Sequence, residues 1–300
     1  MIELPESFLA MPRWWKEGGE WLAGLPGAVE EQCARWGLRI TGEVAHGSNA
    51  VVVPVVRDGV ELALRMSPPG DEVAAQVRAL RWWNGRGTVR LYDADAGRGA
   101  MLLERLGESL AERPVGESMQ VLGRLMRRLA VPAPADALST ADIVATRSAE
   151  LERDWQALGR PFDESYLIAA LRVAGSLAVT DSQASVDGDL HADQVLRDIQ
   201  PLDAVPGRRR EPWLVVDPVL LRGDVEFDLA RILWTRLDEM GDDAEILQHF
   251  ATAVGAAGLD RRRARDWIVF RTVDYWLWGL TAGLTEDPVR CHRLLDAFLP

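Results

Sequence analysis

Hydrophobic and polar positions alternate with two different periods along this chain, and the period changes near residue 105. Before that point, β-branched runs are separated by turn signals, of which Asp58-Gly59 is the strongest hairpin signal. Two stretches in the same part have the spacing of amphipathic helices. The predicted strands lie at about 51–56, 60–66, 89–93 and 100–104, and the predicted helices at about 6–36 and 71–83. Residues 1–105 are therefore predicted to form a helix followed by a small, mostly antiparallel sheet that carries one further helix.

After residue 105 the helical period dominates. Between the helices lies a short extended region, 186–217, which is rich in Asp and interrupted by a Pro-Gly pair. A β-rich first part followed by a helical second part, 106–300, is an α+β organisation, and the pattern alone is compatible with several α+β folds. The predicted helices occupy about 117–130, 139–158, 163–180, 225–239, 242–257, 261–284 and 288–298.

Charge and composition narrow the class of partner. The formal net charge of −12 disfavours a nucleic-acid partner, because phosphate binding requires clustered Lys and Arg, and it is compatible with a cationic substrate. The two cysteines lie far apart in the chain, so neither a disulfide framework nor a cysteine metal site is indicated, which fits a reducing cytoplasm. The sequence has no run of eighteen apolar residues and no signal-peptide pattern, so we predict neither a membrane span nor secretion.

The segment VDGDLHADQVLR, residues 186–197, carries side chains suited to phosphoryl transfer. Asp189 lies in a predicted loop, and the amide of Gln194 follows five residues later, just before a predicted strand. Phosphoryl transfer needs a carboxylate that orients and deprotonates the attacking hydroxyl, and oxygen ligands that hold Mg²⁺ against the phosphates. One loop with this spacing can supply both.

A second acidic segment, residues 212–230, ends a predicted buried strand on Asp217. A carboxylate at the end of a strand, beside a turn, suits a metal ligand. Asp224 and Asp228 follow and lead into a predicted helix. We expect these two acids to brace the catalytic loop and cap the helix rather than touch substrate.

Together the two segments resemble a known family. DGDLHADQVL is similar to the HGDxHxxN catalytic loop of aminoglycoside phosphotransferases, and WLVVDPVLLRGDVEFDLA is similar to their metal-binding strand and the GDPxxDLA element after it. EWLAGLP, ARWGL, VVVPVVRDG and MLLERL resemble more narrowly the streptomycin and hydroxyurea phosphotransferase branch. The resemblance covers about residues 18–300. It implies a protein-kinase-like, two-lobed α+β fold, with a small antiparallel sheet in the N-lobe, 1–105, and a mainly helical C-lobe, 106–300.

The resemblance further implies an ATP-dependent O-phosphotransferase that acts on a small hydroxylated molecule, such as a streptomycin-type antibiotic or a related metabolite. On this interpretation Asp189 orients the acceptor hydroxyl, and Gln194 and Asp217 hold Mg²⁺ on the ATP. His191 stands at the position of the family's histidine, where we expect it to organise the loop.

The same resemblance implies nucleotide contacts in the N-lobe. Arg65 stands where the family strand presents a lysine to the α- and β-phosphates, and Glu72, at the start of the next predicted helix, is a candidate partner for it. Ser48 and Asn49 lie in the loop expected to cover the phosphates. These four residues are expected to help bind the nucleotide.

Two further segments, residues 101–106 and the loop 198–211, are candidates for ligand contacts. MLLERL ends a predicted strand just before the helical part, so the backbone near Glu104 and Leu106 is expected to bind adenine. The loop 198–211 contains three consecutive arginines, which we expect to be solvated, with a phosphate or partner contact as the alternative.

Three positions depart from the family pattern and leave a second function open. Asp187 replaces a histidine, Gln194 replaces an asparagine, and Arg65 replaces a lysine, whose compact ammonium differs from a planar guanidinium. A catalytically weak pseudokinase that binds nucleotide is therefore the alternative to an enzyme. Transfer to a peptide or protein hydroxyl is also compatible with the sequence.

In this family the acceptor binds between the catalytic loop and the C-terminal helices, and acidic side chains hold cationic acceptors. Gly279, Thr281 and Ala282 stand where we expect acidic residues in the streptomycin branch, which argues against streptomycin itself. The candidates for acceptor contacts are Glu226, Asp238, Asp274, Trp276 and Trp278.

Overall fold

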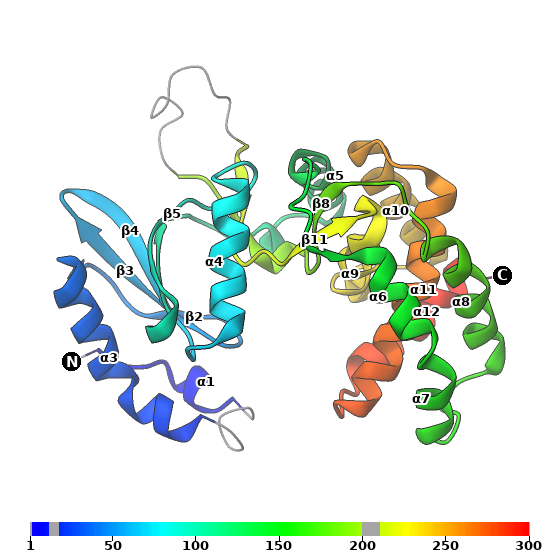
Figure 1. Ribbon diagram of the computed structural model, residues 1–300, viewed down its shortest axis with the longest axis horizontal. Coiled ribbons are helices and arrows are strands. Elements are labelled where there is room, and N and C mark those ends of the chain that lie inside the picture. Colours follow the sequence, from blue (N-terminus) through cyan, green and yellow to red (C-terminus); the bar gives the residue numbers. More distant parts are fainter. Residues whose placement is uncertain (1, 12–17, 200–210, 300) are drawn as a thin grey trace. The chain divides into compact units, whose positions relative to one another are not determined.

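The computed structural model describes residues 2–11, 18–199 and 211–299, and the chain divides into two compact units (Figure 1). Unit 1 comprises residues 1–107 with 198–211, and unit 2 comprises residues 108–197 with 212–300. Unit 1 contains an antiparallel sheet and unit 2 is mainly helical, which confirms the predicted α+β class. The three arginines of the loop 198–211 lie outside the described residues.

The sheet of unit 1 is antiparallel throughout, with the order β1-β3-β4-β6-β5 and with β2 paired to β3. Asp58 and Gly59 connect β3 to β4 with φ angles of 52° and 81°, the left-handed pair that a two-residue hairpin turn requires. The prediction of this hairpin from Asp-Gly is therefore confirmed. The strands are β1 (Arg39–Ile40), β2 (Ala45–His46), β3 (Val51–Arg57), β4 (Val60–Met66), β5 (Leu91–Asp95) and β6 (Ala100–Glu104).

One face of this sheet packs against helix α3 (Gly19–Trp36), and α1 (Glu6–Leu9) adds Phe8 to the same core. Alternate residues of β3, at positions 51, 53 and 55, are fully buried in that core because side chains of a strand alternate between its faces. Leu64 and Met66 of β4 join them, so Arg65 between them points to the opposite face. Helix α4 (Asp71–Trp83) follows β4 in the chain.

Unit 2 is built around the long helix α11, which packs against α8, α9 and α12, while α5 packs against α10. The predicted helix over 139–158 breaks after Ser148 into α6 and α7, and the predicted helix over 225–239 is two 3₁₀ turns flanking the six-residue α9. The apolar period runs across both breaks, so the pattern does not reveal them. The helices of unit 2 are α5 (Val115–Leu129), α6 (Thr140–Ser148), α7 (Leu151–Ala157), α8 (Glu164–Leu177), α9 (Leu229–Trp234), α10 (Asp243–Ala257), α11 (Arg261–Thr281) and α12 (Glu286–Phe298), with 3₁₀ turns η2 (Leu110–Glu112), η3 (Ala192–Gln194), η5 (Val225–Asp228) and η6 (Leu237–Glu239).

Two small sheets in unit 2 hold the Asp-rich region. β8 (Ala184–Asp187) pairs antiparallel with β11 (Leu220–Gly223), which also pairs with β7 (Leu138–Ser139), and β9 (Val195–Arg197) pairs antiparallel with β10 (Trp213–Val215). The loop 188–194 connects β8 to β9, and the loop 216–219 connects β10 to β11. Because each loop joins the same two sheets, the two loops run side by side.

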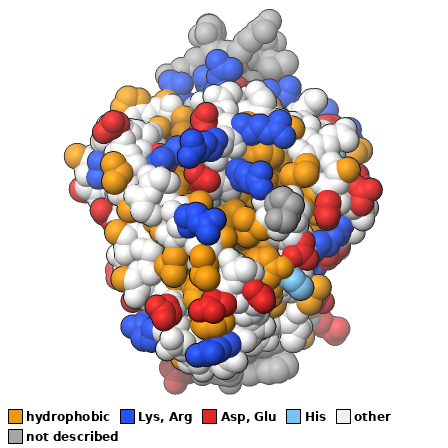
Figure 2. All heavy atoms as spheres, turned by 90° about the vertical axis from the view of Figure 1, so that its right-hand side faces the viewer, with side chains coloured by type: hydrophobic (Ala, Val, Ile, Leu, Met, Phe, Trp, Pro, Cys, Tyr) orange, Lys and Arg blue, Asp and Glu red, His pale blue; other side chains and the backbone are white. Residues whose placement is uncertain are grey.

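One face of the molecule has a surface of mixed character (Figure 2). On the face shown in Figure 2, basic and acidic side chains are interspersed with hydrophobic ones, as on an ordinary solvated surface. Within the described ranges, no helix combines the length and the apolar character that a membrane crossing requires.

Candidate active site

Asp189 is fixed through both carboxylate oxygens. The Gln194 side-chain amide donates to its Oδ2 at 3.0 Å, and the guanidinium Nε of Arg231 lies 2.9 Å from its Oδ1. The side chain nevertheless remains 37% exposed, so a small molecule can reach it. The structure therefore brings together Asp189 and Gln194, which the sequence paired, and adds Arg231 from α9, which the sequence analysis missed.

Asp187, at the end of β8, connects the loop 188–194 to the loop 216–219. Its Oδ1 accepts hydrogen bonds from the backbone N–H of Val219 at 3.0 Å and of Asp189 at 3.3 Å. The Gly188 N–H also donates to the Val219 carbonyl at 2.8 Å. With 1% of its surface exposed, Asp187 is a structural carboxyl that fixes the catalytic loop.

Burial gives Asp187 a pH-dependent effect on stability. Desolvation raises the pKa of its carboxyl to about 7, the two N–H donors oppose this, and the carboxylates of Asp189 and Asp217 add to it. The unfolded chain releases this proton near pH 4, so the stability that the protonated group contributes is lost as the pH rises from about 4 to about 7. The free energy of unfolding is measured by urea titration at pH 5 and at pH 8. The difference in this free energy between Asp187→Asn and the wild type should shift in favour of the variant by about 2 kcal/mol from pH 5 to pH 8. A constant difference across that range would contradict this assignment.

Gln194 and Asp217 offer oxygen atoms suited to Mg²⁺. The Gln194 Oε1 atom is buried and has no hydrogen-bond partner within the described chain, whereas the amide nitrogen donates a hydrogen bond to Asp189. The Val216 N–H donates a hydrogen bond of 2.9 Å to the Gln194 carbonyl, which ties the two loops together. Asp217 is the next residue after Val216. Within the described residues no group of three His, Cys, Asp or Glu side chains is arranged for a metal.

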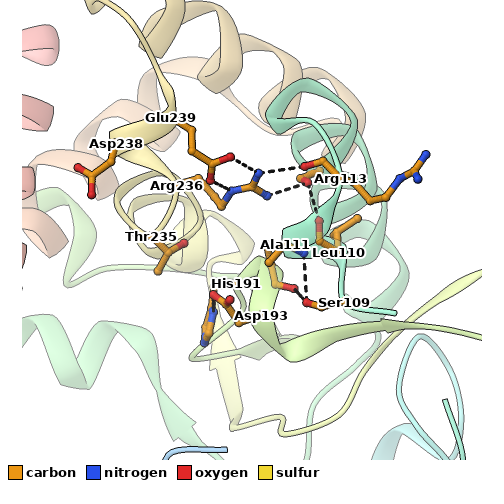
Figure 3. A network of polar contacts seen from close by, with 12 residues as sticks. Ser109, Leu110, Ala111, Arg113, His191, Asp193, Thr235, Arg236, Asp238 and Glu239 are labelled. Atoms are coloured by element: carbon orange, nitrogen blue, oxygen red, sulfur yellow. Dashed lines mark hydrogen bonds and ion pairs between the residues drawn. The ribbon is translucent and has the colours of Figure 1, made fainter. Parts of the chain in front are cut away.

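A polar network supports the far end of the catalytic loop (Figure 3). His191 Nδ1 lies 3.2 Å from Asp193, and the Ser109 hydroxyl donates to the Ala192 carbonyl at 3.5 Å. Nearby, the buried guanidinium of Arg236 contacts Glu239 and donates to the Arg113 carbonyl at 2.9 Å. His191 therefore takes part in organising the loop, and Arg236 anchors the segment that leads into α5.

Asp224 and Asp228 have separate tasks. The Leu190 N–H donates to Asp228, which braces the catalytic loop, and burial raises the pKa of this carboxyl well above its usual range. Asp224 instead binds the Thr180 hydroxyl at 2.5 Å, the Arg263 guanidinium at 2.6 Å and the Trp267 indole N–H at 2.8 Å, so it joins the end of α8 to α11. Neither side chain caps η5 or α9, so that part of the prediction was wrong.

A cavity of about 730 Å³ opens beside Asp189 within unit 2. Asp274 and Trp278, two predicted acceptor contacts, line it from α11. Arg147, Arg231 and Arg271 also line it, and the sequence analysis named none of these arginines. The complete lining is Ile143, Arg147, Asp154, Asp189, Arg231, Trp234, Arg271, Asp274, Tyr275, Leu277, Trp278 and Thr281.

The other three predicted acceptor contacts lie elsewhere. Trp276 is buried against Phe162, with ring centroids 4.4 Å apart, because it points from the opposite face of α11. Asp238 is 64% exposed and forms an ion pair with Arg290. Glu226 lines a separate cavity of about 470 Å³ near Asp224. These placements correct the expectation that Glu226, Asp238 and Trp276 border the same cavity as Asp189.

The predicted nucleotide contacts of unit 1 fall into two groups. Arg65 is buried and donates to the Asn49 side-chain carbonyl and to the Ser67 hydroxyl, each at 3.1 Å. Asn49 lies in the tight turn between β2 and β3, which the bond from the Gly47 N–H to the Ala50 carbonyl closes at 2.9 Å. The structure therefore joins the predicted phosphate loop to the predicted phosphate-binding arginine, with Ser48 exposed in the same turn.

The remaining candidates are less directly connected. Glu72 is exposed in the first turn of α4, and its pairing with Arg65 stays a prediction. The Glu104 carboxylate is buried at the end of β6 and accepts the Arg90 N–H at 2.6 Å, so its side chain serves the sheet. Leu106 follows as a half-buried residue just before the chain leaves unit 1. Adenine binding by the backbone of this segment stays a prediction.

Comparison with solved structures identifies the fold. Choline kinase LicA from Streptococcus pneumoniae matches with a TM-score of 0.60 at 12% identity, over 91% of this chain and 98% of its own. The aminoglycoside phosphotransferase APH(4)-Ia also matches with a TM-score of 0.60, at 16% identity, over 91% and 99% of the two chains. The predicted kinase-like α+β fold is confirmed.

Comparison of sequences identifies the family. The chain is 34% identical over 294 residues to streptomycin 6-kinase of Streptomyces glaucescens, covering 94% of this chain and 92% of the relative. It is 36% identical over 291 residues to hydroxyurea phosphotransferase of Kitasatospora aureofaciens, covering 94% and 81%. The family model described as aminoglycoside/hydroxyurea antibiotic resistance kinase matches residues 35–283. Because the family model covers most of the chain and both relatives are more than 30% identical to it over most of their length, the chain belongs to the aminoglycoside/hydroxyurea antibiotic resistance kinase family.

Proposed function

We propose that this chain transfers the γ-phosphoryl group of ATP to a hydroxyl group of a small molecule bound in the cavity beside Asp189. The observation that carries the proposal is the placement of Asp189, a partly exposed carboxylate held on both oxygens at the cavity wall. The acceptor hydroxyl gives its proton to Asp189 while its oxygen bonds to the γ-phosphorus. The bond from that phosphorus to the β–γ bridging oxygen breaks, and ADP leaves.

The nucleotide and its ion have candidate ligands in the chain. ATP as co-substrate is supported by family membership and by solved complexes of APH(4)-Ia with ADP or AMP-PNP and hygromycin B. Arg65, held by Asn49, is our candidate for the α- and β-phosphates. Gln194 and Asp217 would hold Mg²⁺ through their side-chain oxygens, and the bound ion neutralises charge on the phosphates.

Gln194→Ala tests this assignment of the metal ligand. The variant loses both the candidate Mg²⁺ oxygen and the 3.0 Å support of Asp189. We expect the Mg²⁺ concentration needed for half-maximal transfer to rise about tenfold or more, and calorimetric titration to show weaker binding of ATP in the presence of Mg²⁺. Gln194→Asn, which restores the family's amide, should behave more like the wild type. An unchanged Mg²⁺ requirement in Gln194→Ala would exclude the assignment.

The acceptor belongs to the class of small hydroxylated molecules. The relatives are named for streptomycin and hydroxyurea, and APH(4)-Ia has been solved with hygromycin B. Nothing in these comparisons favours the pseudokinase alternative, because the relatives are named as kinases or phosphotransferases.

Incubation of the protein with ATP, Mg²⁺ and a panel of streptomycin, hydroxyurea and uncharged polyols tests the proposal. We expect at least one panel member to gain a phosphoryl group, detected by mass spectrometry, in step with the release of ADP. Nucleotide binding without phosphorylation of any acceptor would instead support a pseudokinase.

A further inference from the structure

The cavity beside Asp189 contains as many arginines as acids, and the acids are already engaged. Arg147 donates to Asp274 at 2.7 Å and to Asp154 at 3.1 Å. Arg231 forms the 2.9 Å ion pair with Asp189. Each of the three carboxylates that line the cavity therefore faces a guanidinium of the protein itself, so an ammonium or guanidinium group of a ligand would compete with that guanidinium.

Arg271 is the third arginine of the cavity wall, and it is weakly paired. Its side chain is only 16% exposed, its ion pair with Asp274 is 3.9 Å long, and its buried Nε has no hydrogen-bond partner within the described chain. The guanidinium carbon lies 4.0 Å from the centre of the Phe227 ring, which covers one face of the group. Arg271 therefore has hydrogen-bonding capacity that the described residues do not use, although the carboxylates of Asp228 and Asp189 also lie near its charge.

Aromatic rings supply a flat part of the same wall. Trp234 and Tyr275 stack with ring centroids 4.3 Å apart and an interplanar angle of 12°. Tyr275 also stacks with Trp278 at 5.2 Å, and Trp278 is 54% exposed. This surface suits the apolar face of a ring, and it carries no negative charge of its own.

We propose that the acceptor is a hydroxylated molecule that bears a carboxylate or similar oxyanion, bound by Arg271, and that polycationic aminoglycosides are poor acceptors. This inference rests on the proposed function. A cationic acceptor would have to take Asp154, Asp189 or Asp274 from its arginine, leaving a largely buried guanidinium without its counter-charge. An oxyanion would instead give Arg271 the charge-assisted hydrogen bonds that it lacks.

The test compares acceptors that share one ring and differ in charge. Glucosamine, glucose and glucuronate are offered with ATP and Mg²⁺, together with streptomycin and hydroxyurea as cationic and neutral references, and kcat/KM is measured from phosphorylated product. We expect the wild type to favour glucuronate over glucosamine at least tenfold. Arg271→Gln should remove that preference, and Arg271→Lys should restore part of it. Arg262→Gln, at an exposed arginine of the same helix, is the matched control and should behave as the wild type.

The possible results separate this inference from the proposed function. Fastest transfer to streptomycin or glucosamine, or an Arg271→Gln variant with an unchanged preference, overturns the anionic acceptor and leaves the phosphotransferase intact. Phosphorylation of no panel member overturns both. Should Arg271→Gln fail to fold, as thermal melting would show, the wild-type preference and the Arg271→Lys variant decide the question.

Discussion

Replacement of Asp189 by Asn should lower kcat for phosphoryl transfer by about 10³-fold, because an amide cannot take the proton of the acceptor hydroxyl. The variant keeps an oxygen that can accept from Gln194, and its side chain has nearly the same volume. We therefore expect a folded protein with nearly unchanged affinity for ATP. Product formation under saturating ATP and calorimetric titration of ATP measure the two quantities.

A control acid shows whether the loss is specific to the site. Asp243, an exposed residue in the first turn of α10, carries the same charge and lies outside the cavity wall. Asp243→Asn should retain the wild-type rate. An Asp189→Asn variant that keeps more than a tenth of the wild-type kcat would exclude Asp189 as the base.

Replacement of Asp224 by Ala should lower the free energy of unfolding by about 3–5 kcal/mol. This carboxylate has 3% of its surface exposed and accepts hydrogen bonds from Thr180, Arg263 and Trp267. Without it, the buried indole N–H of Trp267 loses its acceptor and the half-buried guanidinium of Arg263 loses its carboxylate partner. Urea unfolding at neutral pH measures the effect.

Asp238→Ala is the matched control for that prediction. The Asp238–Arg290 pair has the same 2.5 Å separation as the Asp224–Arg263 pair, but Asp238 is 64% exposed whereas the Asp224 side chain is 4% exposed. An exposed pair contributes about 1 kcal/mol or less. Equal losses of unfolding free energy in Asp224→Ala and Asp238→Ala would contradict the claim that burial makes the Asp224 pair more stabilising.

The two loops that carry Asp189 and Asp217 could be located from the sequence because their polar residues are local in the chain. Asp189 and Gln194 lie on one loop, and Asp217 follows a short apolar run that had to be a strand. Pairing of β9 with β10 and of β8 with β11 then brings the loops together, as the resemblance to a known family implied. The role of Asp187 was less accessible, because its two N–H donors belong to different loops.

The cavity wall could be predicted only in part. Arg271, Asp274, Tyr275 and Trp278 recur at helical spacing and share one face of α11, so the period starting from Asp274 contained the signal. Trp276 is two positions from Asp274 and therefore points away, into the aromatic cluster around Phe162. Both tryptophans were candidates for acceptor contacts because of their residue type. The helical period distinguishes them, because it places only Trp278 on the same face of α11 as Asp274.

The arginines that neutralise the cavity had no local signature. Arg147 lies on α6 and reaches Asp274, which is 127 residues away in the chain. Arg231 lies on α9. The sequence predicted one helix over 225–239, so it did not show that α9 begins only after the 3₁₀ turn η5. Such pairs depend on the packing of distant helices, so a single sequence did not reveal that the acids beside Asp189 are already paired.

Phosphorus NMR of the reacting mixture tests the central claim most directly. With wild-type protein, ATP, Mg²⁺ and an accepted alcohol, we predict a phosphomonoester resonance that grows in step with ADP, and no such resonance from Asp189→Asn over the same period. Inorganic phosphate as the sole product, or ester formed by Asp189→Asn at the wild-type rate, would contradict transfer to an alcohol activated by Asp189.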